Sequence, residues 1–95
     1  MGLNSSLSLL PEHLQRLGYS THMVGKWHLG YCHPAYLPTR RGFQSHLGQW
    51  TKITHYYSRQ TRENAHPAAQ GYDWHDGEEV SHLGEGDWTT EVITR

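Results

Sequence analysis

A helix pattern that leads through one glycine into a strand pattern is the strongest constraint on the fold of this chain. Leu10, Leu14 and Leu17 recur at helical spacing, which places one apolar stripe on a helix predicted over residues 9–17. After the glycine, residues 19–24 are rich in β-branched and aromatic side chains, which predicts a short buried strand. Because a helix followed by a strand is half of an α/β unit, the pattern favours an α/β fold with parallel pairing.

The rest of the chain offers few regular elements. Glycine and proline recur over residues 25–48, which predicts a long loop, and residues 50–70 show no clear periodicity. Residues 72–80 predict a short hairpin around an Asp-Gly turn, and Thr89 is predicted to cap a last helix. No partner strand is visible beside the first strand. We therefore expect an incomplete sheet with long loops, as in a fragment of a larger fold.

Composition excludes several classes of protein. The 95 residues include only 35% hydrophobic side chains, which leaves room for one small domain with a thin core. The net charge is -1 and no long block carries one sign, so we expect no nucleic-acid partner. No run approaches the roughly 18 apolar residues of a membrane span, and we expect no membrane partner. The first apolar cluster is too short for a signal peptide, and no basic segment precedes it.

The densest candidate for chemistry follows directly after the predicted strand. Ligands of open α/β sheets bind beyond the carboxyl ends of strands, which is where residues 25–30 fall. In an extended segment Lys26 and His28 share one face, while Trp27 turns the other way to pack. A fixed cation beside a proton donor or acceptor suits an oxyanion such as sulfate or phosphate. The alternative is a surface loop anchored by a buried tryptophan.

The longer string around these residues carries a family resemblance. Residues 18–28, Gly-Tyr-Ser-Thr-His-Met-Val-Gly-Lys-Trp-His, resemble the second signature of the sulfatase family position for position. Residues 37–43, Leu-Pro-Thr-Arg-Arg-Gly-Phe, resemble arylsulfatase B-like enzymes, and weaker similarity continues to the end of the chain. The resemblance implies a fragment of an alkaline-phosphatase-like α/β domain. We expect residues 1–8 to be disordered or frayed and residues 9–95 to form a partial sulfatase catalytic domain.

The resemblance also implies a mechanism. Sulfatases attack the sulfur of a sulfate ester with a formylglycine hydrate, which is made from the cysteine of a Cys-x-Pro-x-Arg motif, and a calcium ion clamps the sulfate oxygens. In the family the signature lysine contacts the sulfate and the formylglycine. The signature histidine hydrogen-bonds the formylglycine hydroxyl and assists sulfate elimination. The resemblance assigns these catalytic and substrate-binding roles to Lys26 and His28.

The chain departs from the family at the other catalytic elements. Cys32 lacks the arginine offset of the formylglycine motif, and Tyr36 stands where close relatives carry a cysteine. The paired aspartates and the Asp-Asn pair that bind calcium are absent. We therefore expect calcium and formylglycine to depend on other sequence, and this chain alone not to hydrolyse its substrate. That substrate would be an aryl sulfate or a sulfated glycan such as a glycosaminoglycan. Lysosomal or secreted placement is implied by resemblance.

The nine histidines raise a second hypothesis, a non-catalytic fragment that binds a metal or a sulfated glycan. Its zinc ligands would be His22, His28, His33 and Cys32, although their spacing fits no standard pattern. Its glycan contacts would be Arg40 and Arg41, which otherwise hold the loop to acidic neighbours. The remaining histidines considered are expected to be polar groups that face solvent: His55, His66, His75 and His82.

Overall fold

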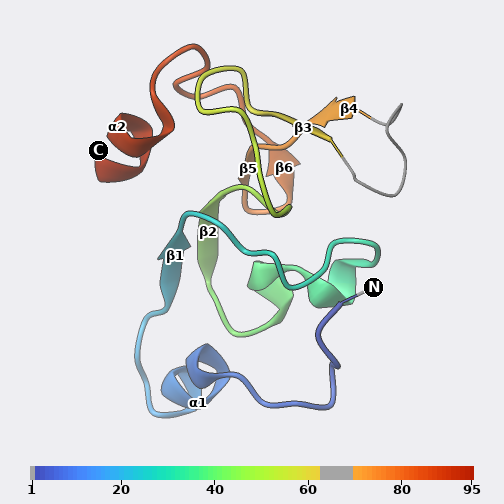
Figure 1. Ribbon diagram of the computed structural model, residues 1–95. Helices are drawn as coiled ribbons and strands as arrows, with labels where there is room; N and C mark the ends of the chain where they lie inside the picture. The colour runs from blue at the N-terminus through green and yellow to red at the C-terminus, as the bar shows by residue number, and fades with distance from the viewer. Residues whose placement is uncertain (1, 63–69) are drawn as a thin grey trace.

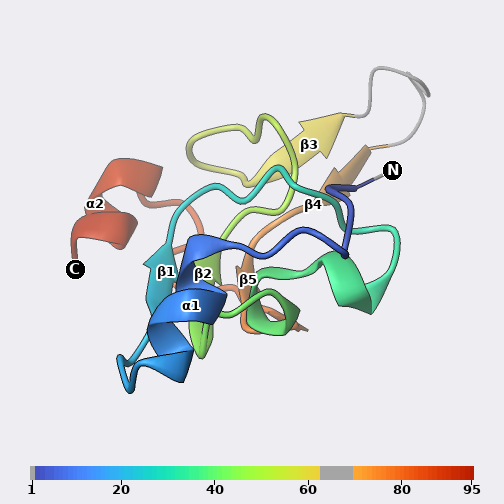
Figure 2. The ribbon, with the colours of Figure 1, turned by 90° about the horizontal axis from the view of Figure 1, so that it is seen from below.

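The computed structural model describes residues 2–62 and 70–95. Figure 1 shows β1 and β2 side by side, with α1 near their amino ends and the loop after β1 at the opposite end. Figures 1 and 2 agree that the two chain termini lie on opposite sides of the molecule. The elements are α1 (Leu10–Arg16), β1 (His22–Val24), η1 (Pro34–Tyr36), η2 (Pro38–Arg40), β2 (Ser45–Gly48), β3 (Gln60–Arg62), β4 (Gln70–Tyr72), β5 (His75–Asp76), β6 (Glu79–Val80) and α2 (Thr89–Thr94).

The main sheet has the strand order β1-β2-β5-β6. β1 and β2 run parallel, with Met23 opposite His46, whereas β5 and β6 join as antiparallel strands. The predicted α/β class and incomplete sheet are confirmed. The prediction that the first strand has no visible partner is wrong, because β2 forms within the expected loop. Its sequence Ser-His-Leu-Gly has little β-branched character, which is why the pattern did not reveal it.

The first helix and strand form where the sequence places them, but they are less buried than predicted. α1 contains Leu10 and Leu14, and Leu17 follows as its cap residue, yet Leu10 and Leu17 remain 70% and 75% exposed. β1 is only three residues long, and Val24 is 51% exposed. The prediction of a buried strand is therefore wrong within this chain, since β1 lies at the edge of the sheet and pairs only with β2.

The predicted hairpin is confirmed with a shift of one residue. Asp76 pairs with Glu79, so the two central turn residues are Gly77 and Glu78. Gly77 has a φ of 63°, a conformation that glycine adopts without strain. The last helix also forms, but its N-cap lies one residue before the predicted Thr89. Trp88 occupies the cap position, while the Thr89 hydroxyl donates to the Tyr56 carbonyl.

A buried arginine organises the carboxyl-terminal half of the chain. Arg59 is 0% exposed, and its guanidinium lies 4.7 Å from the ring centre of Trp74. It takes part in no ion pair among the described residues. It donates instead to backbone and hydroxyl oxygens: the carbonyls of Tyr56, Tyr57, Gly84 and Asp87, and Oγ1 of Thr89. This one side chain therefore ties the loop before β3 to the start of α2.

The adjacent arginines hold loops, as one of the two sequence readings predicts. Arg40 forms a two-pronged ion pair with Glu78, whose Oε1 lies 2.6 Å from Nε. Arg41 is buried and donates to the carbonyls of Leu3, Asn4 and Leu7 at 3.0–3.3 Å. Arg41 is thus not accessible to a glycan, whereas the exposed Arg40 guanidinium is engaged by Glu78. Fraying of residues 1–8 stays a prediction, and Arg41 is the contact that opposes it.

We expect Arg59→Leu to lower the free energy of unfolding by about 3 kcal/mol, because it leaves several buried carbonyls without their donor. Urea denaturation measures this change. Arg16→Leu, at an exposed position of α1, should change stability by less than about 0.5 kcal/mol. Equal effects of the two substitutions would show that the buried guanidinium does not organise this region.

Arg41→Ala should release the amino-terminal segment without unfolding the sheet. Hydrogen exchange of the Leu3 and Leu7 amides, which bond to the carbonyls of Leu29 and Asn4, should quicken by about tenfold or more. Arg40→Ala breaks only an exposed ion pair and should leave these amides unchanged. If both amides exchange freely before any substitution, the segment is frayed and Arg41 does not hold it.

Candidate functional site

The segment after β1 continues the parallel pairing beyond the strand. The Gly25 amide donates to the Leu47 carbonyl at 2.8 Å, and the Trp27 amide donates to the Gln49 carbonyl at 2.9 Å. One residue further, the His28 amide donates to the Trp50 carbonyl at 3.0 Å. The segment is therefore fixed at the carboxyl end of the β1–β2 pair, the end of the sheet where the sequence predicts a ligand.

Trp27 anchors the segment from its buried side. Its ring is 7% exposed and meets Phe43 edge-on at a centroid distance of 6.2 Å. The indole N–H donates to the Tyr36 carbonyl at 2.8 Å. The structure thus confirms the prediction that Trp27 turns inward to pack.

Lys26 and His28 lie on either side of this anchor, and both side chains are exposed. Within residues 2–62 and 70–95, neither side chain takes part in a hydrogen bond or an ion pair. His28 has a φ of 56°, so the extended path assumed from the sequence ends at this residue. Both polar groups are available to a ligand. That they bind one sulfate together stays a prediction.

A buried carboxylate supports the neighbouring backbone. Asp73 accepts the amide of Trp50 on Oδ1 and the amide of Thr51 on Oδ2, each at 2.9 Å. The Thr51 hydroxyl donates to Oδ2 at 2.5 Å, and His75 Nε2 lies 3.1 Å from Oδ1. Both carboxylate oxygens are therefore occupied by donors of this chain.

His75 is part of this cluster, so the prediction that it faces solvent is wrong. Its ring is buried and stacks on Trp50 with a centroid distance of 3.5 Å and an interplanar angle of 2°. The alternation of an extended chain places Asp73 and His75 on one side, a signal that could have found the pair. His55 and His82 are exposed as predicted, and His66 lies outside the described residues.

His46 is a second buried histidine that the sequence analysis missed. It belongs to β2, is 1% exposed, and its Nε2 lies 3.0 Å from the Gly25 carbonyl oxygen, where an N–H can donate. Burial lowers the pKa of His46 and outweighs the opposing effect of this hydrogen bond, which favours the neutral ring. The residue was missed because it falls in the segment predicted to be a loop.

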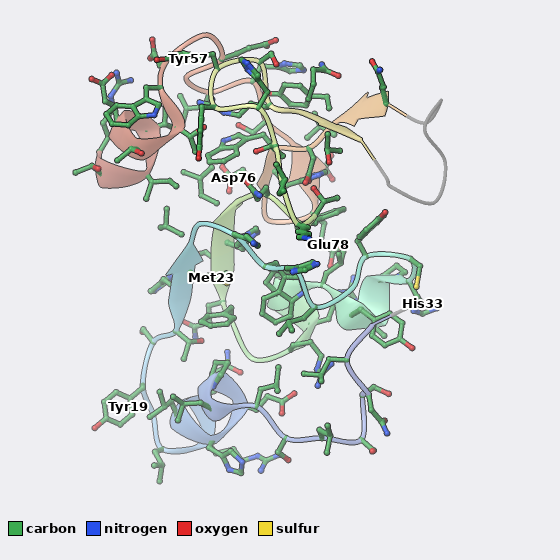
Figure 3. The ribbon with its side chains drawn as sticks, in the orientation of Figure 1. Tyr19, Met23, His33, Tyr57, Asp76 and Glu78 are labelled. Carbon is green, nitrogen blue, oxygen red and sulfur yellow. The ribbon has the colours of Figure 1, made fainter. Side chains whose placement is uncertain are left out.

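The residues that the structure describes do not fit the expected metal centres. No three histidine, cysteine, aspartate or glutamate side chains are grouped to hold a metal ion in those ranges. His22 bonds to Ser45, and His33 accepts the amide of Ala35, so the zinc set is not assembled. Figure 3 shows His33 at the edge of the molecule, well away from Met23 on β1. The Asp73 carboxylate oxygens are also occupied by donors of this chain, so they are not open to a calcium ion.

The formylglycine motif is likewise not present around Cys32, a cysteine at the surface, because Tyr36 stands at the arginine offset. We therefore derive no chemical step through formylglycine or calcium from these residues. Among the described residues, no helix combines the length and apolar character needed to cross a membrane.

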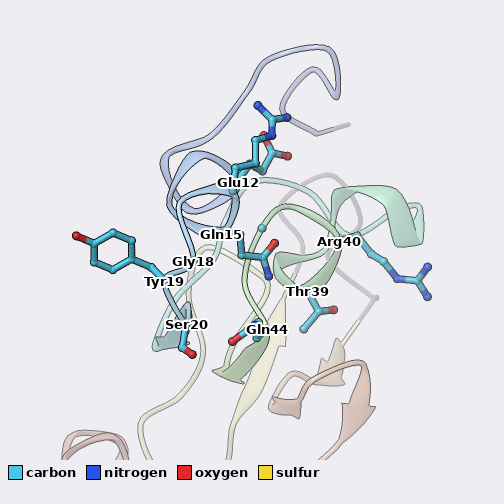
Figure 4. A pocket seen from close by; sticks show the side chains of 10 residues that line it. Glu12, Gln15, Gly18, Tyr19, Ser20, Thr39, Arg40 and Gln44 are labelled. Carbon is cyan, nitrogen blue, oxygen red and sulfur yellow. The ribbon is translucent and has the colours of Figure 1, made fainter.

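An open hollow of about 660 Å³ lies at the other end of β1, between α1 and η2. In Figure 4 Gln15 and Gln44 border this hollow, while Tyr19 and Arg40 extend away from it in opposite directions. Neither Lys26 nor His28 lines it. This hollow is thus separate from the candidate site.

Asp73 gives the protein a specific acid sensitivity. Burial would raise its pKa, but hydrogen bonds from His75, Thr51 and the Trp50 amide outweigh burial and lower the pKa below its usual value. A carboxyl with a lowered folded pKa stabilises the fold above its unfolded pKa of about 4. That contribution is lost as pH falls through the lower folded value.

We therefore expect stability to fall below about pH 4, and Asp73→Asn to lower stability at pH 7 and flatten this acid limb. Urea denaturation between pH 2 and pH 7 measures both effects. Asp76→Asn, at an exposed position of β5, should leave the acid limb in place. An unchanged limb in Asp73→Asn would contradict the assignment.

Comparisons with known proteins place the chain in a family. The family described as Sulfatase matches residues 2–91. Arylsulfatase J of Mus musculus is 36% identical over 87 residues, which cover 90% of this chain and 14% of that protein. Arylsulfatase G of Rattus norvegicus is 49% identical and N-acetylgalactosamine-6-sulfatase of Homo sapiens 45% identical over 47 residues, which are 50% of this chain and 9% of either relative. The chain thus spans about a seventh or less of these relatives.

Solved structures support the same fold. The crystal structure of Ps i-CgsB superposes with a TM-score of 0.73 and 18% identity, covering 96% of this chain and 22% of that one. Its complex with k-i-k-neocarrahexaose gives a TM-score of 0.76 at 20% identity and the same coverage. The partial α/β sheet is therefore that of the alkaline-phosphatase-like sulfatase fold. With 90 of its 95 residues within the family match and a curated relative 36% identical, this chain belongs to the sulfatase family.

Proposed function

We propose that this chain contributes Lys26 and His28 to the site of a sulfuric ester hydrolase that binds the sulfate group. The observation that carries the proposal is the exposure of both side chains on a segment whose backbone is fixed. Hydrogen bonds hold residues 25–28 to the strand end beside them, while the ammonium and imidazole groups have no partner among the described residues. A preorganised anion site requires a fixed backbone and polar side-chain groups that have no other partner.

The two side chains suit different parts of the reaction. The Lys26 ammonium would neutralise charge that accumulates on the sulfate oxygens in the transition state. Removal of a comparable oxyanion donor costs roughly 10²–10³ in rate in other enzymes. The His28 imidazole can give or take a proton at an ester or hydroxyl oxygen, a contribution of roughly 10²–10⁴ when the geometry is correct.

Binding is the part of this function that the chain is proposed to perform by itself. Calcium and formylglycine chemistry would come from other sequence, because this sequence has no Cys-x-Pro-x-Arg motif. We propose a sulfated glycan, including a glycosaminoglycan, or an aryl sulfate as the substrate class. The complex of Ps i-CgsB with an oligosaccharide supports a glycan as the carrier of the ester. Arylsulfatase B-like specificity and lysosomal or secreted placement are parts of the same proposal.

Titration of the 95-residue chain with 4-nitrophenyl sulfate, followed by ¹H–¹⁵N NMR, tests the proposal. We expect shifts centred on residues 25–28. Lys26→Ala and His28→Ala should each weaken binding about tenfold, which corresponds to about 1.4 kcal/mol for one charge-assisted hydrogen bond.

Matched controls come from α1, at the opposite end of β1. Arg16→Ala removes an exposed cation and His13→Ala an exposed imidazole, and neither should change the affinity. Binding that is insensitive to Lys26 and His28, or equally sensitive to the controls, would refute the proposed site.

A further inference from the structure

The segment that carries Lys26 and His28 is held at both ends by buried polar side chains. We infer that His46 and Asp73 are positioning residues. They fix the backbone from Gly25 to His28 and so determine where the ammonium and imidazole groups contact a sulfate ester. The inference rests on the proposed function for the identity of the ligand, a sulfate ester. The backbone geometry of residues 25–28 is present without a ligand.

His46 fixes the start of the segment. Its Nε2 lies 3.0 Å from the Gly25 carbonyl oxygen, while the Gly25 amide donates to Leu47 on the same strand. Gly25 is therefore held by β2 at both its amide and its carbonyl. Gly48 closes the arrangement, because a Cβ at this position, where φ is 153°, would overlap the Gly25 carbonyl. The backbone at Gly25 has little freedom to shift.

Asp73 fixes the far end through one intermediate residue. Its carboxylate accepts the amides of Trp50 and Thr51, which orients the Trp50 peptide, and the carbonyl of Trp50 accepts the His28 amide. His28 has the left-handed φ of 56°, which is unfavourable for a residue with a side chain. The hydrogen bond to Trp50 opposes relaxation toward an extended conformation, and relaxation would re-aim the imidazole.

His75 completes the support without contacting the segment. It stacks on the Trp50 ring and lies 3.1 Å from Asp73, so Trp50 is held by its ring and by its amide. The antiparallel strand β5 lies beside β2 and places His75 opposite Gly48, at the carboxyl end of the parallel pair. Contacts from His75 and Asp73 through Trp50 therefore connect β5 to the exposed His28.

The test uses the 95-residue chain and two kinds of readout. In Asp73→Asn, one side of the side chain becomes an amide donor that faces the backbone amides. We expect the His28 amide to exchange about tenfold faster, its three-bond HN–Hα coupling to change, and the affinity for 4-nitrophenyl sulfate to fall about tenfold. The Trp27 indole N–H signal should stay in place, which shows that the fold is kept. Asp76→Asn, the same substitution at an exposed carboxylate of β5, should change none of these quantities.

The His46 end has its own pair of variants. His46→Phe removes the donor to Gly25 and should weaken binding about tenfold, whereas His46→Gln can place an N–H near the same carbonyl and should restore most of the affinity. This pair decides the inference if Asp73→Asn does not fold.

Unchanged His28 exchange and coupling in Asp73→Asn would overturn the inference, as would equal affinities of His46→Phe and His46→Gln when the parent chain binds 4-nitrophenyl sulfate. Failure of the proposed function looks different. In that case the parent chain does not bind 4-nitrophenyl sulfate, yet the exchange and coupling of His28 still respond to Asp73→Asn and still support the positioning role.

Discussion

The parallel pairing of β1 with β2 is the interaction on which the rest of the structure depends. Its ladder runs over His22–Val24 and continues past the strand, through the amides of Gly25, Trp27 and His28. Two successive amides, those of Trp27 and His28, both bond to the adjacent chain, which a regular strand does not allow. The left-handed turn at His28 makes this possible. The backbone of the candidate site is thus an irregular extension of the sheet.

Buried polar groups replace much of the apolar core in this chain. Only five apolar side chains in the described ranges are buried: Trp27, Leu37, Pro38, Trp74 and Val92. Arg41 and Arg59 are also buried, and both direct their guanidinium groups at backbone carbonyls. A buried charge is tolerated where hydrogen bonds satisfy it, and removal of one partner then destabilises strongly. Such contacts are directional, so they fix loops that a small apolar core could not place.

Local patterns in the sequence predicted the elements with local causes. Leucine spacing and a glycine stop located α1, and the glycine turn located the β5–β6 hairpin. β2 was not predicted, because its side chains are mostly polar and its pairing partner lies more than twenty residues earlier. The roles of Arg59 and Asp73 escaped for the same reason. Their partners are backbone groups of distant loops, and no sequence pattern encodes which carbonyl or amide a buried side chain will meet.

The candidate site was predictable in its residues and not in its geometry. Lys26 and His28 follow from the signature string and from their place after a strand, whereas the φ of His28 depends on a carbonyl brought in by β2. Trp27 explains why the polar groups of Lys26 and His28 nevertheless stay exposed to solvent. Its ring packs on Phe43 and its N–H bonds to Tyr36, so this residue cannot rotate outward without losing both contacts. The residues on either side must then face the surface, and the buried anchor keeps the ammonium and the imidazole available to an anion.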